Sequence, residues 1–185
     1  MYEDFLMHYG IKGMHWGVRR TPEQLGHTKS PESLSSKMKK LKYREYTTLQ
    51  SPEKTMKYGG SCHDQTFAAL KSLRKMGLKP KAKFLMEVDD KGHGGMTHSF
   101  AYYKNGNKTV WFENAWKDRA GLHEFDSIKD IQKEFKKAHK NGSFGNNKKY
   151  KNLVWSDFNE KEHKTGENLQ EFVNVCLSEP KKKHE

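Results

Sequence analysis

Cys62 is the residue whose type and position best suit covalent chemistry. It follows the turn-forming residues Gly59-Gly60-Ser61, and residues 62–73 carry apolar side chains at helical spacing. In the first turn of a helix, unpaired N–H groups and the positive end of the helix dipole stabilise a thiolate and lower its pKa. The sequence therefore predicts a nucleophile here. The alternative is a small buried cysteine that closes a glycine turn.

The same helix start could also stabilise the oxyanion of an acyl-transfer intermediate, because its N–H groups can donate to a developing negative charge. Gln65 lies one turn further along and could point to the same place. One helix start would then supply both the activated nucleophile and the oxyanion donors.

A nucleophilic cysteine needs a base, and His98 is the best candidate. It stands in the middle of an expected strand, where alternation places it on the same face as Met96, Phe100 and Tyr102. A neutral imidazole would be held on such an apolar face. The other histidines are expected in turns or beside charged residues, as at positions 63, 93 and 123. Zinc-ligand spacing with a second cysteine is missing, so we expect no metal and no cofactor.

A third group can be derived from the register of a β-hairpin. A two-residue turn at Asn105-Gly106 sets His98 directly opposite Glu113 on one face. A bulged or three-residue turn brings Asn114 to that face instead. Either side chain could orient the imidazole through its second nitrogen, so both remain candidates.

The elements around these residues are expected to alternate between helix and sheet. The sequence predicts helices over 62–73, 128–139 and 168–177, with Ser127 as an N-cap, and strands over 83–88, 96–103, 109–114 and 153–155. This order predicts an α+β fold, in which the nucleophile-bearing helix packs on a small antiparallel sheet.

Length and composition indicate one domain with tails. The 185 residues are 33% hydrophobic and 31% charged, which allows one small core. Residues 1–57 are rich in Gly, Pro and Ser and are expected to form an arm with short helical pieces and no core of its own. We expect the hydrolase-like domain over 58–180 and a basic tail over 181–185. No apolar run is long enough for a membrane span, and from the first residues we expect no secretory signal.

The net charge of +12 favours contact with polyanions. The excess is concentrated over residues 129–151 and in the last residues of the chain. Without interleaved arginines and aromatic base readers, this pattern is more typical of a solvated lysine-rich face than of nucleic-acid recognition. We therefore expect at most nonspecific polyanion contact.

Residues 58–125 together resemble the papain-like and transglutaminase-like cysteine hydrolase superfamily. The resemblance rests on the glycines before Cys62, on His98 in a strand, and on an acid or amide in the next strand. Asn114-Ala115-Trp116 is similar to the Asn-x-Trp of papain-like enzymes, which implies roles for Asn114 and Trp116. Transglutaminase-like relatives have an acidic residue there, which implies Glu113. The papain-like glutamine six positions before the cysteine is replaced by Met56, so an oxyanion donor must come from elsewhere.

The N-terminal segment 8–20 resembles a module on structural proteins of phages that infect Gram-positive bacteria. Its glycines permit tight turns, and Trp16 and Arg19 are suitable anchors for docking to a phage structural protein. The alternative is a disordered leader.

These observations lead to one main hypothesis: a cysteine-dependent acyl-transfer enzyme of phage or prophage origin that acts on a protein or peptide. It would be an amide or peptide hydrolase or a transglutaminase-like enzyme, located in the host bacterial cytoplasm or associated with the virion. The alternative is a non-catalytic virion-associated or host-binding module on the same scaffold.

Overall fold

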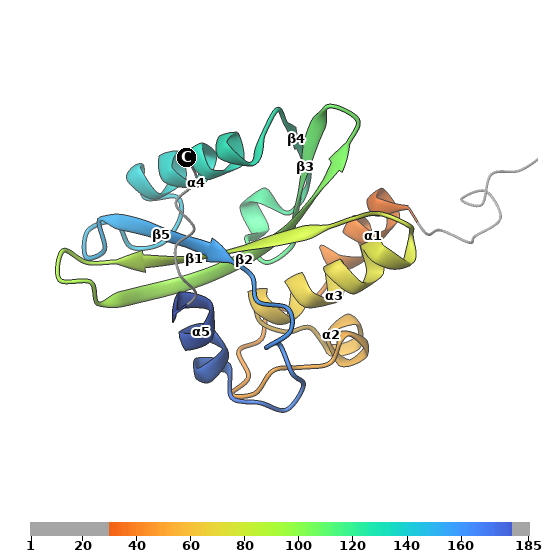
Figure 1. Ribbon diagram of the computed structural model, residues 1–185, viewed down its shortest axis with the longest axis horizontal. Coiled ribbons are helices and arrows are strands. Elements are labelled where there is room, and N and C mark those ends of the chain that lie inside the picture. Colours follow the sequence, from red (N-terminus) through yellow and green to blue (C-terminus); the bar gives the residue numbers. More distant parts are fainter. Residues whose placement is uncertain (1–29, 179–185) are drawn as a thin grey trace, which may run out of the picture.

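The computed structural model describes residues 30–178, which form helices around one antiparallel sheet (Figure 1). In chain order the elements are α1 (Pro31–Met38), α2 (Pro52–Tyr58), α3 (Cys62–Lys75), β1 (Lys81–Val88), β2 (Gly94–Asn105), β3 (Lys108–Glu113), the 3-10 turn η1 (Lys117–Arg119), β4 (Gly121–Phe125), α4 (Ile128–Lys140), β5 (Asn152–Asp157) and α5 (Leu169–Ser178). The predicted α+β class is confirmed. Strand β4 was not predicted, and α1 and α2 were expected only as short helical pieces without stated bounds.

The sheet has the strand order β4-β3-β2-β1-β5, with every neighbouring pair antiparallel. Alternating apolar residues send side chains to both of its faces. On one face, Phe100 and Trp111 pack with Phe135 of α4. On the other, Phe84 and Phe112 pack in a second core with residues of α1, α3 and α5. Figure 1 shows α4 on one side of the sheet and α1, α3 and α5 on the other.

The β2–β3 hairpin differs from the prediction in its turn. Asn105 pairs with Lys108, so the two loop residues are Gly106 and Asn107 and not Asn105 and Gly106. Gly106 has φ +56°, as the first loop position of a type II′ turn requires. The register is therefore displaced by two residues. Because side chains alternate with period two, this displacement leaves every side chain on its predicted face.

The start of α4 confirms Ser127 as the N-cap residue but not its expected bonding. The Ser127 hydroxyl donates to Asp130 Oδ2 at 2.6 Å, and it caps no backbone N–H group of the helix. The helix is fixed mainly by its apolar face, which includes Ile131 and Phe135.

Residues 30–57 belong to the packed domain, in contrast to the expected arm over 1–57. Leu34 and Met38 of α1 and Leu49 in the following loop lie in the core. The loop is also held by backbone pairing, with a β-bridge between Thr48 and Asn168. Pro and Ser, which suggested an arm, begin α1 and α2 instead: Ser30 and Ser51 cap the two helices and a proline follows each cap.

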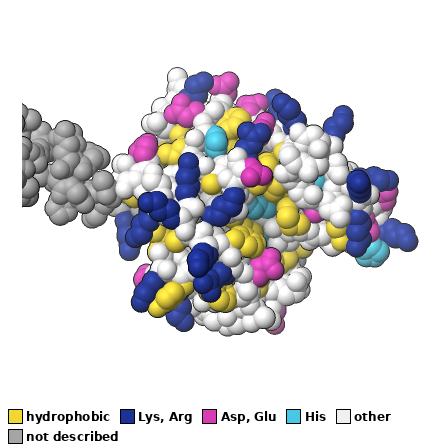
Figure 2. Space-filling model, turned by 180° about the vertical axis from the view of Figure 1, so that it is seen from behind, with side chains coloured by type: hydrophobic (Ala, Val, Ile, Leu, Met, Phe, Trp, Pro, Cys, Tyr) yellow, Lys and Arg dark blue, Asp and Glu magenta, His cyan; other side chains and the backbone are white. Residues whose placement is uncertain are grey.

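Positive side chains are distributed over the surface. Figure 2 shows Lys and Arg spread over much of one face, with acidic side chains between them. In the lysine-rich tract, Lys133 pairs with Asp130 at 2.9 Å and Lys151 with Asp90 at 2.8 Å. Such pairs fit the expected solvated face, and polyanion contact stays a prediction. Within residues 30–178, no helix is long and apolar enough to cross a membrane.

We predict that Leu49→Ala lowers the free energy of unfolding by about 2–5 kcal/mol, because Leu49 is 1% exposed and its removal leaves a cavity. Chemical denaturation measures this change. Thr47→Ala is the matched control, since Thr47 is exposed in the same loop. Equal stability of the two variants would show that this loop is not part of the core.

Candidate active site

Cys62 is the first residue of α3, as predicted. The helix start is fixed by a capping box, in which Ser61 Oγ accepts from Asp64 N and Asp64 Oδ2 accepts from Ser61 N at 3.1 Å. Asp64 is also held by His163, whose Nε2 lies 3.3 Å from Oδ1. The position of the sulfur is therefore set by a rigid helix terminus.

The end of β3 creates the space in which Cys62 lies. The pairing of β3 with β2 runs from Ala101 to Asn105, whereas β2 continues back to Gly94. The start of α3 reaches β2 beyond the end of β3, and Cys62 Sγ lies 3.7 Å from the carbonyl oxygen of Thr97, to which the thiol can donate. The cysteine thus meets the strand segment that carries His98.

His98 is held by a buried carboxylate. Its Nε2 donates to Glu113 Oε2 at 2.9 Å. The same carboxylate oxygen accepts from Trp111 Nε1 at 3.2 Å, and Oε1 accepts from the three backbone N–H groups of residues 114–116 at 2.9–3.0 Å. Glu113 is 1% exposed, so these donors replace the water that a carboxylate needs. Because Nε2 is bonded to Glu113, Nδ1 is the ring nitrogen that can interact with Cys62.

The two-residue displacement of the hairpin explains how Glu113 reaches His98. Continuing the observed register by one residue sets Glu113 opposite Phe100, so it meets His98 diagonally and not directly as predicted. The His98 ring also packs against Phe135 and Phe144, each with ring centroids 5.6 Å away. The imidazole is thus confined on its apolar face, as the alternation indicated.

A second histidine, His63, lies beside Cys62, and its role was missed in the sequence. It is buried in the first turn of α3, next to Asp64, whereas the sequence indicated only a place in a turn or beside charged residues. Its Nδ1 lies 2.7 Å from Ser99 Oγ and its Nε2 lies 3.1 Å from Thr97 Oγ1. Its position directly after the candidate nucleophile at a helix start was the available signal.

The charges around Cys62 favour a thiolate. Burial alone would raise the thiol pKa, but the charge of His63 and a hydrogen bond with it, followed by the same effects of His98, bring it down to about 5. Burial alone would lower the pKa of His98, but the Glu113 charge and hydrogen bonds with Cys62 and Glu113 raise it to about 10. Between these values the stable state is a thiolate beside an imidazolium.

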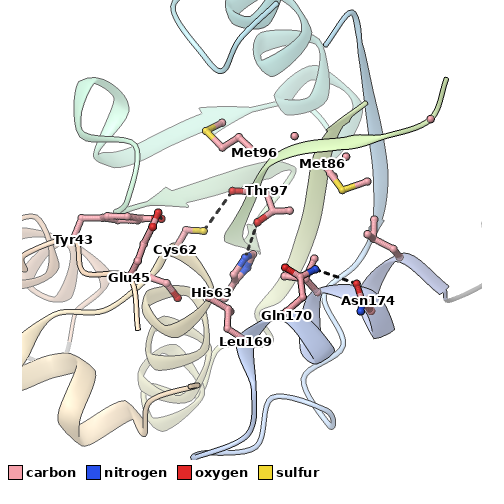
Figure 3. Close-up of a pocket in the computed structure, with 16 residues that line it drawn as sticks. Tyr43, Glu45, Cys62, His63, Met86, Met96, Thr97, Leu169, Gln170 and Asn174 are labelled. Atoms are coloured by element: carbon pink, nitrogen blue, oxygen red, sulfur yellow. Dashed lines mark hydrogen bonds between the residues drawn. The ribbon is translucent and has the colours of Figure 1, made fainter. Parts of the chain in front are cut away.

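Cys62 lies at the floor of a cavity of about 650 Å³ (Figure 3). The sulfur-bearing residue is itself only 3% exposed. The cavity walls come from residues 43–45, the start of α3, the adjoining ends of β1 and β2, and α5. Its larger side chains besides His63 are Tyr43, Glu45, Met86, Met96, Leu169, Gln170, Val173, Asn174 and Leu177. A peptide or an extended side chain could enter this space and present a carbonyl group to the sulfur.

The other predicted site residues lie elsewhere. Gln65 is buried and its amide donates to Gly60 O at 2.8 Å, so it does not act as the expected oxyanion donor. Asn114 is buried and contacts Glu113 through its backbone N–H. Trp116 packs on Phe144, with centroids 4.9 Å apart, in the cluster behind His98. Trp16 and Arg19 lie outside the described residues.

Metal binding finds no support in the described part of the chain. Residues 30–178 contain no group of three or more His, Cys, Asp or Glu side chains that could hold an ion. Cys62 and Cys176 form no disulfide.

The lowered thiol pKa predicts an unusual pH dependence of Cys62 alkylation. The iodoacetamide rate constant should stay nearly constant from pH 8 to 6 and fall as the pH drops through about 5, because the thiolate is protonated only there. Mass spectrometry of Cys62-containing peptides measures the rate. Cys62→Ala reports any background from Cys176, and a midpoint near pH 8.5 would contradict the predicted ion pair.

A second prediction distinguishes whether Glu113 or Asn114 orients His98. Glu113→Gln removes the charge that raises the His98 pKa, so the alkylation midpoint should rise and the rate at pH 6 should fall about ten-fold or more. Asn114→Ala should leave the midpoint unchanged, because its side chain is not bonded to His98. The opposite result would assign the orienting role to Asn114.

Residues 1–23 match the model of a family of unknown function, DUF7211. No curated protein matches the sequence. The matched residues include the segment 8–20 and precede the described part of the chain. The match therefore bears on the N-terminal segment and not on the Cys62 site.

Proposed function

We propose that the chain is a cysteine-dependent acyl-transfer enzyme with a papain-like or transglutaminase-like arrangement. Cys62 is the nucleophile, His98 is the acid and base, and Glu113 orients His98. One observation carries the proposal: Cys62, at a helix start, contacts the strand segment that carries His98, and the Nε2 of His98 is held by a buried carboxylate. These are the relations that nucleophile, base and orienting group require in acyl transfer.

The proposed reaction begins with attack of the Cys62 thiolate on the carbonyl carbon of an amide. The S–C bond forms and an electron pair of the carbonyl moves to oxygen. The His98 imidazolium then protonates the amide nitrogen, the C–N bond breaks, the amine leaves, and a thioester remains. Water deprotonated by neutral His98 attacks the thioester and releases the acid and the thiolate. An amine in place of water would give transamidation.

His98 suits the proton-transfer role better than His63. Both ring nitrogens of His63 are within hydrogen-bond distance of hydroxyl groups, on Ser99 and Thr97. His98 has its Nε2 bonded to the Glu113 carboxylate, which keeps the proton on that nitrogen and leaves Nδ1 for Cys62. His63 therefore contributes mainly to thiolate stabilisation in this proposal.

The cavity and the N-terminal segment bear on the substrate and on the location of the protein. The open cavity suits a protein or peptide substrate better than a small buried metabolite. The resemblance of residues 8–20 to a phage structural module supports phage or prophage origin, docking to a structural protein, and action in the host cytoplasm or on the virion. Recruitment to assembled particles with and without residues 1–29 would test the docking role.

We predict that p-nitrophenyl acetate acetylates Cys62 and that Cys62→Ala abolishes this acetylation. His98→Ala should slow it by about 10²–10⁴-fold, because the thiolate loses the His98 charge and both ring nitrogens of the remaining imidazole, His63, lie beside hydroxyl groups. Stopped-flow release of p-nitrophenolate and intact-protein mass measure the reaction.

The matched control is His123→Ala, because His123 bonds to the Arg119 carbonyl and does not line the cavity. It should react like the wild type. Equal acetylation of wild type and His98→Ala would overturn the enzyme proposal. A folded, unreactive wild type would favour the non-catalytic module on the same scaffold.

A further inference from the structure

Acyl transfer needs a hydrogen-bond donor at the oxygen that becomes negative in the tetrahedral intermediate. Gln65 was expected to supply this donor, but its side-chain amide donates to the Gly60 carbonyl oxygen. Among the N–H groups of the first helical residues, that of Asp64 donates to the Ser61 cap, which leaves those of Cys62 and His63 near the sulfur. A side-chain donor must come from another wall of the cavity.

Tyr43 lies on that other wall. It lines the same cavity as Cys62, and Figure 3 shows its phenol pointing toward the Cys62 sulfur. The residue is 44% exposed and lines the cavity, so an entering substrate can reach its side chain. In the free protein this hydroxyl lies 3.5 Å from Glu45 Oε1, a long hydrogen bond that can be exchanged for a stronger acceptor.

The backbone holds Tyr43 at a fixed place beside the nucleophile. Tyr43 forms a parallel β-bridge with Gly60, two residues before Cys62. Gly60 N donates to Lys42 O and Arg44 N donates to Gly60 O, each at 3.2 Å. A Cβ atom on Gly59 would lie 2.0 Å from Lys42 O, so only glycine permits this close approach. The glycine turn thus docks the Tyr43 segment as well as starting the helix.

We propose that Tyr43 is a catalytic residue that donates its phenolic O–H to the oxyanion formed when Cys62 attacks a carbonyl. This role rests on the proposed acyl transfer. As the S–C bond forms, the carbonyl electron pair moves to oxygen, which accepts hydrogen bonds from the phenol and from the backbone N–H at the start of α3. The phenolic proton stays on Tyr43 when the C=O bond is restored and the amine leaves.

The protonation state of Tyr43 agrees with a donor role. Burial, the negative charge of the Cys62 thiolate and then that of Glu45 raise the pKa of the phenol well above its ordinary value. The hydroxyl therefore keeps its proton throughout the range in which Cys62 and His98 form an ion pair. A phenol that stays protonated beside a thiolate can donate but does not compete as a nucleophile.

Tyr43→Phe tests the proposal because two reactions of Cys62 differ in their need for an oxyanion donor. Acetylation by p-nitrophenyl acetate passes through a tetrahedral oxyanion, whereas alkylation by iodoacetamide is a direct displacement at carbon. The variant should acetylate about 10²-fold more slowly and alkylate at the wild-type rate. Tyr58→Phe is the matched control, since Tyr58 is exposed and does not line the cavity.

Each outcome decides the role of Tyr43. An unchanged acetylation rate overturns it. An equal fall in both rates also overturns it, because Tyr43 would then act on the thiolate and not on the oxyanion. The melting temperature shows that the variant is folded, as expected for loss of one hydroxyl from a half-exposed ring. A wild-type protein that is never acetylated contradicts the acyl-transfer function itself, together with this role.

Discussion

The buried carboxylate of Glu113 is the interaction on which the candidate site depends. It receives five hydrogen bonds, from His98, from Trp111 and from the three N–H groups that follow it. Burial of this charge with fewer hydrogen bonds would lower the stability of the folded protein. Removal of one partner would leave part of the charge without compensation. Because the three backbone bonds also turn the chain after β3, the same group ends the strand and orients the imidazole.

The end of β3 connects this carboxylate to the nucleophile. If β3 continued to pair with β2, its backbone would occupy the edge that Cys62 approaches at Thr97. Cys62 reaches that edge from the helical layer containing α3, whereas the His98 ring lies on the α4 face. The site therefore lies where the sheet narrows, and groups from both of its faces can meet there.

The sequence predicted those parts of the site that follow from local periodicity. Cys62 at a helix start and His98 on an apolar strand face were derived from residue spacing, and both placements are confirmed. Glu113 was found although the turn was placed one residue too early and the register was therefore wrong by two residues, because an even displacement preserves the strand face. Asn114 remained an alternative, since only the actual turn distinguishes odd from even displacement.

Other parts could not be predicted because they depend on contacts between distant residues. Tyr43 stands in a segment without helical or strand periodicity, and only its bridge to Gly60 brings it to Cys62. Leu34, Met38 and Leu49 are separated by polar residues, so their shared burial in the core was hidden. His63 was not chosen as a site residue, because its burial against Thr97 and Ser99 follows only from the packing of α3 on the sheet.

The side chains around the cavity suit the proposed acyl transfer inside a strongly basic protein. The chain has 35 Lys and Arg residues, but none of those within residues 30–178 lines the cavity around Cys62. A lysine there could stabilise the thiolate, but its charge would persist throughout catalysis and could not be passed to a leaving group. An imidazole can stabilise the thiolate while charged and then release its proton to the departing amine. The exclusion of lysine from the cavity therefore leaves the thiolate dependent on groups that can take part in proton transfer.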